Sequence, residues 1–410
     1  MTLPELDPPT LVEDAAGMDR LLADLADHDE IAVDTEADSF FSYREKVCLV
    51  QITVAERDYL VDPLAPGVDL ARLADVFADP DTTKVLHDCE YDVLILARDH
   101  GFRFAGLFDT RVAAATLGTP TPGLASVLEE HFGVVLDKSQ QRSNWAKRPL
   151  TEDQVRYARL DTHFLLPLAA EQRVALLERD RMVFVEAECR RLERMEPVPN
   201  DFQPDDFVRI KGARGLSPSE RRVLRELFVL REELAEAADV PPFRVLNNQV
   251  LIELARQRPR DERRLAAVHG FSVRMVRRMG DRVLETIERA RRLDPIRDLP
   301  PQPKKDGTEG MDDQEVELFE RLKRWRKDVA DELAIESSYL LNRALMSAIA
   351  RGRPGDAAAL AAAGLEPWQV ERFGEAVLAR VADFERDLAA GEVDPPRAWR
   401  RRTRRKGRAR

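Results

Sequence analysis

Two stretches of this 410-residue chain are copies of one another. Residues 246–261 (LNNQVLIELARQRPRD) align without a gap on residues 341–356 (LNRALMSAIARGRPGD), 95 positions further along the chain. The matches include turn residues as well as apolar ones, which makes coincidence a poor explanation. Both copies lie in blocks with helical apolar spacing and no convincing strands. The duplication therefore predicts two similar helical bundles in tandem.

The residues before the copies have a different pattern. Short β-rich runs occur at residues 31–38, 47–54, 58–63 and 84–88, and helical periodicity takes over from about residue 92. Strands followed by helices predict a mixed sheet flanked by helices. The expected segments are an α/β domain (1–196), a first helical domain (197–293), a linker rich in Pro, Gly and charge (294–313), a second helical domain (314–390) and a basic tail (391–410).

Composition narrows the class of protein. Hydrophobic residues make up 44% of the chain and charged residues 34%, and no apolar run is long enough for a membrane span. The start, MTLPELDPPT, lacks the pattern of a secretion signal. Cys48, Cys89 and Cys189 have unrelated spacings, which argues against a disulfide framework and a structural zinc site. We therefore expect a soluble cytoplasmic protein with no membrane partner.

The net charge of −11 argues at first sight against a nucleic-acid partner. The charge is uneven, however, because residues 397–410 carry nine Lys or Arg and no acid. A basic arm of this density gains affinity for a phosphate backbone by releasing counterions. Composition alone equally allows a solvated, disordered tail.

Four acids and one tyrosine carry the chemistry. Asp34 and Glu36, two apart on a strand, point to the same side. Tyr157 and Asp161 are one turn apart on a helix, and Asp92 stands at the start of another. Taken alone, each of these residues could have a structural role, as a solvated acid, a helix cap or a ring packed in the core. Gathered in one cleft, the acids would require divalent cations between them, as in sites that hydrolyse phosphodiesters with two metal ions.

The order D-x-E, then Y-D, then Y-x-x-x-D resembles the DEDD exonuclease superfamily in its tyrosine variant. The segments VCLVQITV, GLASVLEEHFG and KSQQRSNWAKRPLTEDQVRYARLDTHFLL are similar to those of bacterial ribonuclease D, and the resemblance covers essentially the whole chain. It implies an RNase H-like α/β nuclease domain, with a mixed sheet flanked by helices, followed by two all-α HRDC-like helical bundles.

The same resemblance implies roles for the acids and the tyrosine. Two divalent cations, Mg²⁺ or Mn²⁺, would be held by Asp34, Glu36, Asp92 and Asp161, and Tyr157 would position the nucleophilic water. The implied activity is stepwise 3′→5′ removal of nucleoside monophosphates from RNA. The implied substrates are RNA 3′ ends, with tRNA precursors the expected case, and we expect a monomer.

Substrate contacts are predicted at two places. Phe40 and Tyr43 follow the first acidic motif and could stack on terminal bases, although loop packing is equally open. Four residues before the catalytic helix could hold the strand's backbone or stack on a base: Gln141, Arg142, Ser143 and Trp145. Arginines of the first helical domain, Arg244 among them, are candidate phosphate contacts. We expect His163 on the outer face of its helix.

Three other functions remain to be weighed. A non-cutting RNA-binding scaffold would be expected to have lost at least one of the five residues, and none is lost. A DNA 3′–5′ exonuclease shares every catalytic group, so only the resemblance favours RNA. A helicase needs a phosphate-cradling G-x-x-x-x-G-K-[ST] loop, which the sequence lacks.

Overall fold

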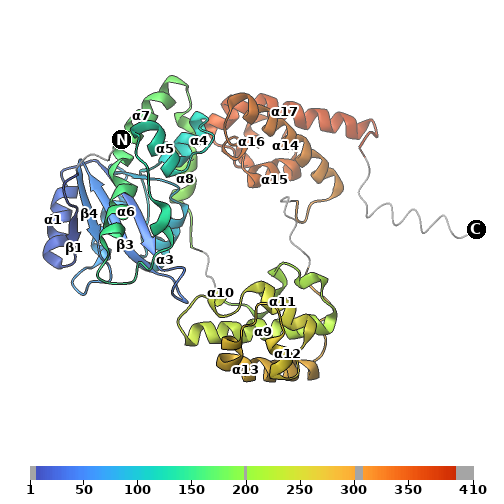
Figure 1. Ribbon diagram of the computed structural model, residues 1–410. Helices are drawn as coiled ribbons and strands as arrows, with labels where there is room; N and C mark the ends of the chain where they lie inside the picture. Colours follow the sequence, from blue (N-terminus) through green and yellow to red (C-terminus); the bar gives the residue numbers. More distant parts are fainter. Residues whose placement is uncertain (1–5, 198–200, 301–307, 394–410) are drawn as a thin grey trace, which may run out of the picture.

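The computed structural model describes residues 6–197, 201–300 and 308–393. These ranges form an α/β domain, a first helical module and a second helical module, in that order (Figure 1). Part of the predicted linker and nearly all of the basic tail lie outside the described residues. Among the helices that are described, none is long and apolar enough to span a bilayer.

A six-stranded mixed sheet forms the centre of the α/β domain, in the order β1-β4-β3-β2-β5-β6. The strand β2 pairs antiparallel with β3 and parallel with β5, so it lies in the interior of the sheet. The strands are β1 (Thr10–Val12), β2 (Glu30–Ala37), β3 (Val47–Val54), β4 (Arg57–Val61), β5 (Thr83–Leu86) and β6 (Leu107–Asp109). The four β-rich runs of the sequence correspond to β2 through β5. The two edge strands have three residues each, too few to show a periodicity.

Helices cover both faces of this sheet (Figure 1). One of them, α6, contacts β2, β3 and β4 and so lies across the strand that carries the first acidic motif. The helices of the domain are α1 (Ala15–Leu25), α2 (Ala74–Ala78), α3 (Glu90–His100), α4 (Thr110–Leu117), α5 (Leu124–Phe132), α6 (Glu152–His163), α7 (Leu165–Glu178) and α8 (Met182–Glu193). Single turns of 3₁₀ helix occur at η1 (Leu70–Leu73) and η2 (Lys138–Arg142).

The two modules repeat the same local structures. In both, an asparagine caps the central helix, and that helix ends at an arginine with a positive φ, 45° at Arg258 and 43° at Arg353. The first module contains η3 (Pro204–Arg209), η4 (Ala213–Gly215), α9 (Pro218–Ala237), α10 (Pro242–Val245), α11 (Asn248–Gln257), α12 (Glu262–Ala266) and α13 (Val273–Arg292). The second contains α14 (Asp313–Leu333), η5 (Ser337–Tyr339), α15 (Arg343–Gly352), α16 (Ala357–Ala362) and α17 (Pro367–Ala389).

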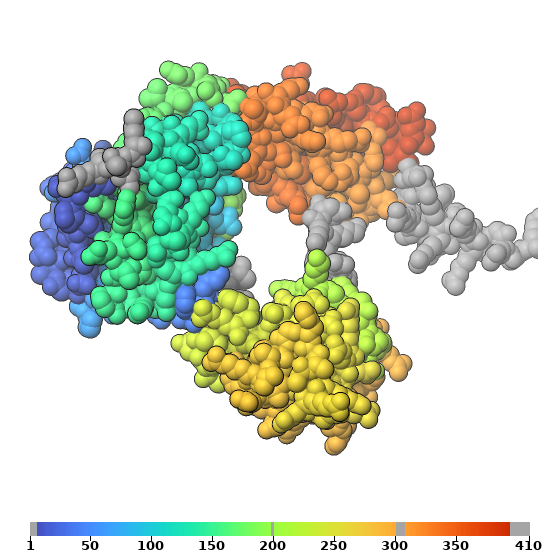
Figure 2. Space-filling view, viewed as in Figure 1, coloured from blue at the N-terminus to red at the C-terminus, as the bar shows by residue number. Residues whose placement is uncertain are grey.

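The modules differ in how they join the α/β domain. The second module shares one continuous apolar core with it, and the Phe184 and Trp368 rings meet edge to face at 5.1 Å. A salt bridge of 2.7 Å between Arg190 and Glu366 adds to this contact. The first module has a core of its own, to which the α/β domain adds the partly buried Tyr43. Figure 2 shows the yellow-green surface of the first module touching the blue surface of the α/β domain.

Candidate active site

The strand β2 supplies the first two acids. Asp34 pairs in register with Gln51 of β3 and Glu36 pairs with Leu49, so the two carboxylates project from the same face. The register shifts between Glu36 and Ala37, where the strand leaves the ladder. Both acids are half-buried. The residues behind them on the strand, Ile31 and Val33, are fully buried, which fixes the orientation of the strand.

The helix α3 supplies the third acid. Asp92 lies in its first turn and is only 6% exposed. The hydroxyl of Thr35, the residue between the two acids of β2, donates a hydrogen bond of 2.5 Å to the Asp92 carboxylate. This bond links the start of α3 directly to the strand β2.

The helix α6 supplies Tyr157 and the fourth acid. A capping box of Thr151 and Gln154 starts the helix, as the sequence T-x-x-Q allows. Tyr157 and Asp161 lie one turn apart, and Tyr157 donates a hydrogen bond to Asp161, which is 5% exposed. The helix is held to the sheet by a 2.8 Å hydrogen bond between the hydroxyls of Thr53 and Thr162.

Ligand oxygens of Asp34, Glu36 and Asp161 all lie within 4.8 Å of one another. Burial raises the pKa of Glu36 to about 9, and the charges of Asp161 and Asp92 add to the shift. Burial also raises the pKa of Asp161 to about 8, against the hydrogen bond from Tyr157 that lowers it. These acids cannot all ionise together at neutral pH without a positive charge between them.

The pKa values of the other two acids are also raised. The pKa of Asp34 is raised well above its usual range, first by burial and then by repulsion from Asp92, Asp161 and Glu36. Burial raises the pKa of Asp92 to about 7, although the hydrogen bond from Thr35 lowers it. Burial and the neighbouring acids raise the pKa of the Tyr157 phenol. Five side chains from three elements therefore form one electrostatic unit.

The segment before α6 connects to this unit. Gln141 makes a hydrogen bond with Tyr157. Ser143 accepts a 3.0 Å hydrogen bond from Gln154 and so ties the segment to the helix. Trp145 is only 1% exposed, and its ring centroid lies 6.0 Å from that of Tyr157. Trp145 therefore packs behind the tyrosine, and no face of its ring is open to a base.

Arg142 and the two aromatic candidates occupy the surface. The Arg142 guanidinium is 5.7 Å from the centre of the Phe40 ring, and Phe40 is 40% exposed. Tyr43 is half-buried, and its hydroxyl donates a 2.8 Å hydrogen bond to Glu232 of the first module. Of the two rings predicted to stack on bases, Phe40 is thus the one left open, whereas Tyr43 is engaged between domains.

Two features of the site were missed in the sequence. Gln51 is fully buried beside Asp34, and neither its amide nitrogen nor its carbonyl oxygen has a partner among the described residues. A glutamine within the largely apolar run VCLVQITV was the available signal. Asp58, 5% exposed, accepts hydrogen bonds of 2.6 Å from Arg159 and 2.9 Å from His163. His163 is therefore an anchor of α6 to the sheet, and its expected place on the outer face was wrong.

Comparisons with known proteins agree with this architecture. A model of the 3′–5′ exonuclease family matches residues 9–174, and a model of the HRDC domain matches residues 220–287 and 315–381. The mixed sheet, the flanking helices and these matches define a 3′–5′ exonuclease that carries two HRDC domains. The expected fold class is confirmed.

Individual relatives identify the family. Ribonuclease D of Pseudomonas paraeruginosa is 32% identical over 361 residues, which cover 85% of this chain and 91% of the relative. The crystal structure of Escherichia coli RNase D is 27% identical with a TM-score of 0.62, and the match covers 92% of this chain and 99% of that one. The exosome complex exonuclease RRP6 of Saccharomyces cerevisiae is 35% identical, but the match spans only 36% of its length. The chain belongs to the ribonuclease D family, and it is a 3′–5′ exoribonuclease.

Proposed function

We propose that the acidic unit is the catalytic centre and that its natural substrates are the 3′ ends of tRNA precursors. The observation that carries the proposal is the clustering of Asp34, Glu36 and Asp161 around one point, with Asp92 and Tyr157 beside them. The natural substrate rests on the likeness to ribonuclease D alone. The solved E. coli relative is described as an exoribonuclease involved in structured RNA processing.

The donor set fits hard divalent cations. All of the clustered ligand atoms are carboxylate oxygens, which suit Mg²⁺ or Mn²⁺. We assign two such cations to the site, held by Asp34, Glu36, Asp92 and Asp161. When bound, they would supply positive charge for the attacking and leaving oxygens of the phosphodiester. The raised pKa values of the acids favour this assignment, because a dication is the charge that lets all four ionise together.

Tyr157 has a separate role in the proposal. Because its pKa is raised, the phenol keeps its proton at neutral pH and acts as a hydrogen-bond donor rather than as a base. Its hydroxyl is held between Asp161 and Gln141, and its ring is supported by Trp145. A phenol fixed in this way can orient a water toward the terminal phosphate, which lowers the entropic part of the barrier.

Two further parts of the proposal concern the whole protein. We propose that it acts as a monomer and that it works in the cytoplasm. All three cysteines are free and buried, as suits a reducing compartment.

A digestion experiment tests the proposed function. Matched single-stranded RNA and DNA, each with a free or a blocked 3′ end, are incubated with the full chain and Mg²⁺, Mn²⁺ or EDTA. We expect mononucleotides from free RNA 3′ ends only, and none in EDTA. Equal cleavage of DNA would identify a general exonuclease, and binding without cleavage would identify a scaffold. In a second arm, a tRNA with an extended 3′ end should be shortened toward its mature length.

A further inference from the structure

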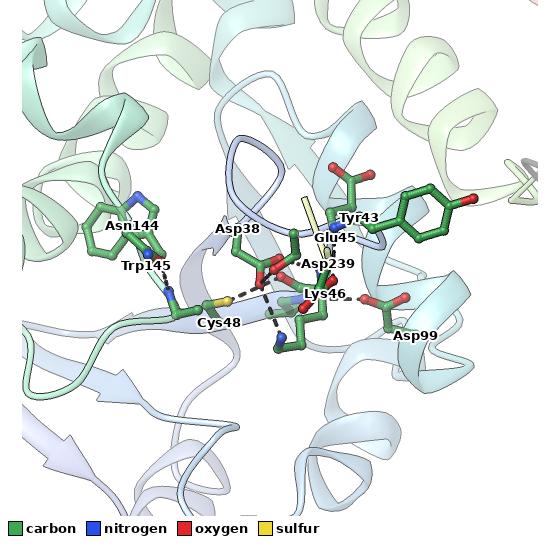
Figure 3. Close-up of polar contacts among 12 residues, drawn as sticks. Asp38, Tyr43, Glu45, Lys46, Cys48, Asp99, Asn144, Trp145 and Asp239 are labelled. Carbon is green, nitrogen blue, oxygen red and sulfur yellow. Dashed lines mark hydrogen bonds and ion pairs between the residues drawn. The ribbon is translucent and has the colours of Figure 1, made fainter. Parts of the chain in front are cut away.

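The loop that leaves the catalytic strand, residues 38–46, is fixed by one buried acid. Asp38 is fully buried and accepts hydrogen bonds from the Lys46 backbone at 2.9 Å and from the Ser42 hydroxyl at 2.5 Å. The Lys46 ammonium group also forms a salt bridge with the Asp38 carboxylate at 3.2 Å. Figure 3 shows Asp38 at the centre of these contacts, with the ring of Tyr43 directed away from it. The loop is therefore a defined structure and can present its side chains in fixed places.

The outer side of this loop holds the first module. The Tyr43 backbone N–H donates to Asp239 at 3.1 Å, and its hydroxyl donates to Glu232 at 2.8 Å. The Arg244 guanidinium lies 4.4 Å from the centre of the Phe41 ring. These contacts join two domains that have separate apolar cores. They bring the short helix α10 of the first module next to the catalytic domain.

Two exposed aromatic rings meet at this junction. Phe40 of the loop is 40% exposed and Phe243 of α10 is 52% exposed. Their centroids are 6.3 Å apart and their planes are inclined at 73°. Arg142 lies over Phe40, and Arg244 follows Phe243 in the chain. Within residues 6–197, 201–300 and 308–393, neither arginine makes an ion pair.

This junction is close to the acids along the chain. Phe40 follows Glu36 by four residues, which an extended chain spans in at most about 14 Å. Arg142 follows Gln141, which makes a hydrogen bond with Tyr157. A strand whose last phosphodiester reached the acids could therefore cross the junction with the nucleotides that precede its 3′ end.

We propose that this junction is a binding surface for single-stranded RNA just upstream of the scissile bond, built from both domains. Exposed rings offer stacking to any base, and unpaired guanidinium groups offer charge to the phosphates. The surface consists of Phe40 and Arg142 from the α/β domain and Phe243 and Arg244 from the first module. The first module thus contributes directly to substrate affinity. The inference rests on the proposed function, since the acids define where the 3′ end lies.

The test compares a long and a short substrate on the full chain. Phe243→Ala is measured with a single-stranded oligoadenylate of about a dozen nucleotides and with a diadenylate too short to reach the junction. We expect KM for the long substrate to rise roughly 5- to 150-fold, with kcat and diadenylate cleavage unchanged, because stacking is lost at one base. Phe243→Trp should restore the affinity. Val273→Ala, at an exposed apolar residue of the same module, should have no effect.

Binding in EDTA separates this inference from the proposed function. Fluorescence anisotropy of the labelled long RNA should show the same loss of affinity for Phe243→Ala, roughly 5- to 150-fold, whether or not the protein cleaves it. Arg244→Ala should weaken binding and reduce its salt slope by about one. If Phe243→Ala binds the long RNA as the wild type does, the surface serves another purpose, such as contact with a protein, and the inference is overturned. Equal losses on both substrates would also overturn it.

Discussion

Replacing Asp161 by asparagine should stabilise the cation-free protein while destroying its activity. The pKa of Asp161 rises from an ordinary 3.8 to about 8 in the folded state. One pKa unit corresponds to about 1.4 kcal/mol, so full ionisation of this buried acid costs up to about 6 kcal/mol. In the wild type, Asp34 and Glu36 also retain protons and so reduce the repulsion on Asp161. We therefore expect a smaller gain, roughly 2–3 kcal/mol at high pH.

The sign of the effect follows from proton binding. Because the folded protein holds the Asp161 proton more tightly than the unfolded chain, stability is lost as the pH rises from about 4 through about 8. The wild type in EDTA should thus be less stable at about pH 8.5 than at about pH 5.5. The Asp161→Asn variant should show a smaller decline. Millimolar Mg²⁺ should restore the wild type at high pH and have little effect on the variant.

Asp58→Asn is the matched control. Asp58 is also 5% exposed and also contacts α6, but its surroundings are opposite in charge. Burial would raise its pKa, yet hydrogen bonds from His163, Thr53 and Arg159 outweigh burial and hold the pKa below its usual value. Its neutralisation should therefore cost about 3 kcal/mol at high pH.

Urea unfolding of the two variants and the wild type, with and without Mg²⁺, measures these differences in the free energy of unfolding. The reasoning fails if Asp161→Asn is no more stable than the wild type in EDTA at high pH. It also fails if Mg²⁺ stabilises Asp161→Asn as much as it stabilises the wild type.

Three further predictions concern catalysis, pH and the second module. Tyr157→Phe should lower kcat about 10²-fold, because it removes the orienting hydroxyl, and leave Mg²⁺ affinity in calorimetry unchanged; an unaltered kcat would exclude that role. The Mg²⁺ concentration for half-maximal rate should fall as the pH rises from about 6 to about 9. Asp161 and Glu36, with pKa values of about 8 and 9, must lose protons to bind a cation. A half-maximal Mg²⁺ concentration that does not change with pH would contradict this. Phe184→Ala should destabilise the α/β domain and the second module together by about 3–5 kcal/mol. The separate calorimetric transition of the first module should stay at the same temperature. Lower unfolding temperatures for both transitions would refute the separation of the cores.

Local spacing was sufficient to predict the elements that carry the site. An acid pair two apart on an apolar run has to share one face of a strand, and a Tyr–Asp pair four apart has to share one face of a helix. The structure has both pairs in those arrangements, on β2 and α6. Their roles as catalytic and metal-binding residues remain predictions.

Burial and partners could not be predicted in the same way. Trp145 and Arg142 are three positions apart in one polar segment, yet one is buried beside Tyr157 and the other is open to solvent. That difference depends on the packing of α6 against the sheet, which no short window of sequence contains. The bonds from Arg159 and His163 to Asp58 join residues about a hundred positions apart. They arise only once the sheet has formed.

The way each module packs against the α/β domain could not be predicted from the sequence either. Their sequences align, and their central helices end in the same left-handed arginine. One module shares a core with the α/β domain through Trp368, whereas the other touches it through the loop that contains Tyr43. The duplicated positions lie within each bundle, whereas Trp368 and Tyr43, which contribute to the two contacts with the α/β domain, lie outside the matched stretches.

The most direct test of the catalytic assignment counts bound cations. Electron paramagnetic resonance can titrate Mn²⁺ into the full chain in the presence of an RNA whose terminal linkage resists hydrolysis. The acid cluster predicts two Mn²⁺ ions per chain for the wild type and at most one, weakly held, for Asp161→Asn. Unchanged stoichiometry and affinity in that variant would contradict the assignment of these acids to a shared two-cation site.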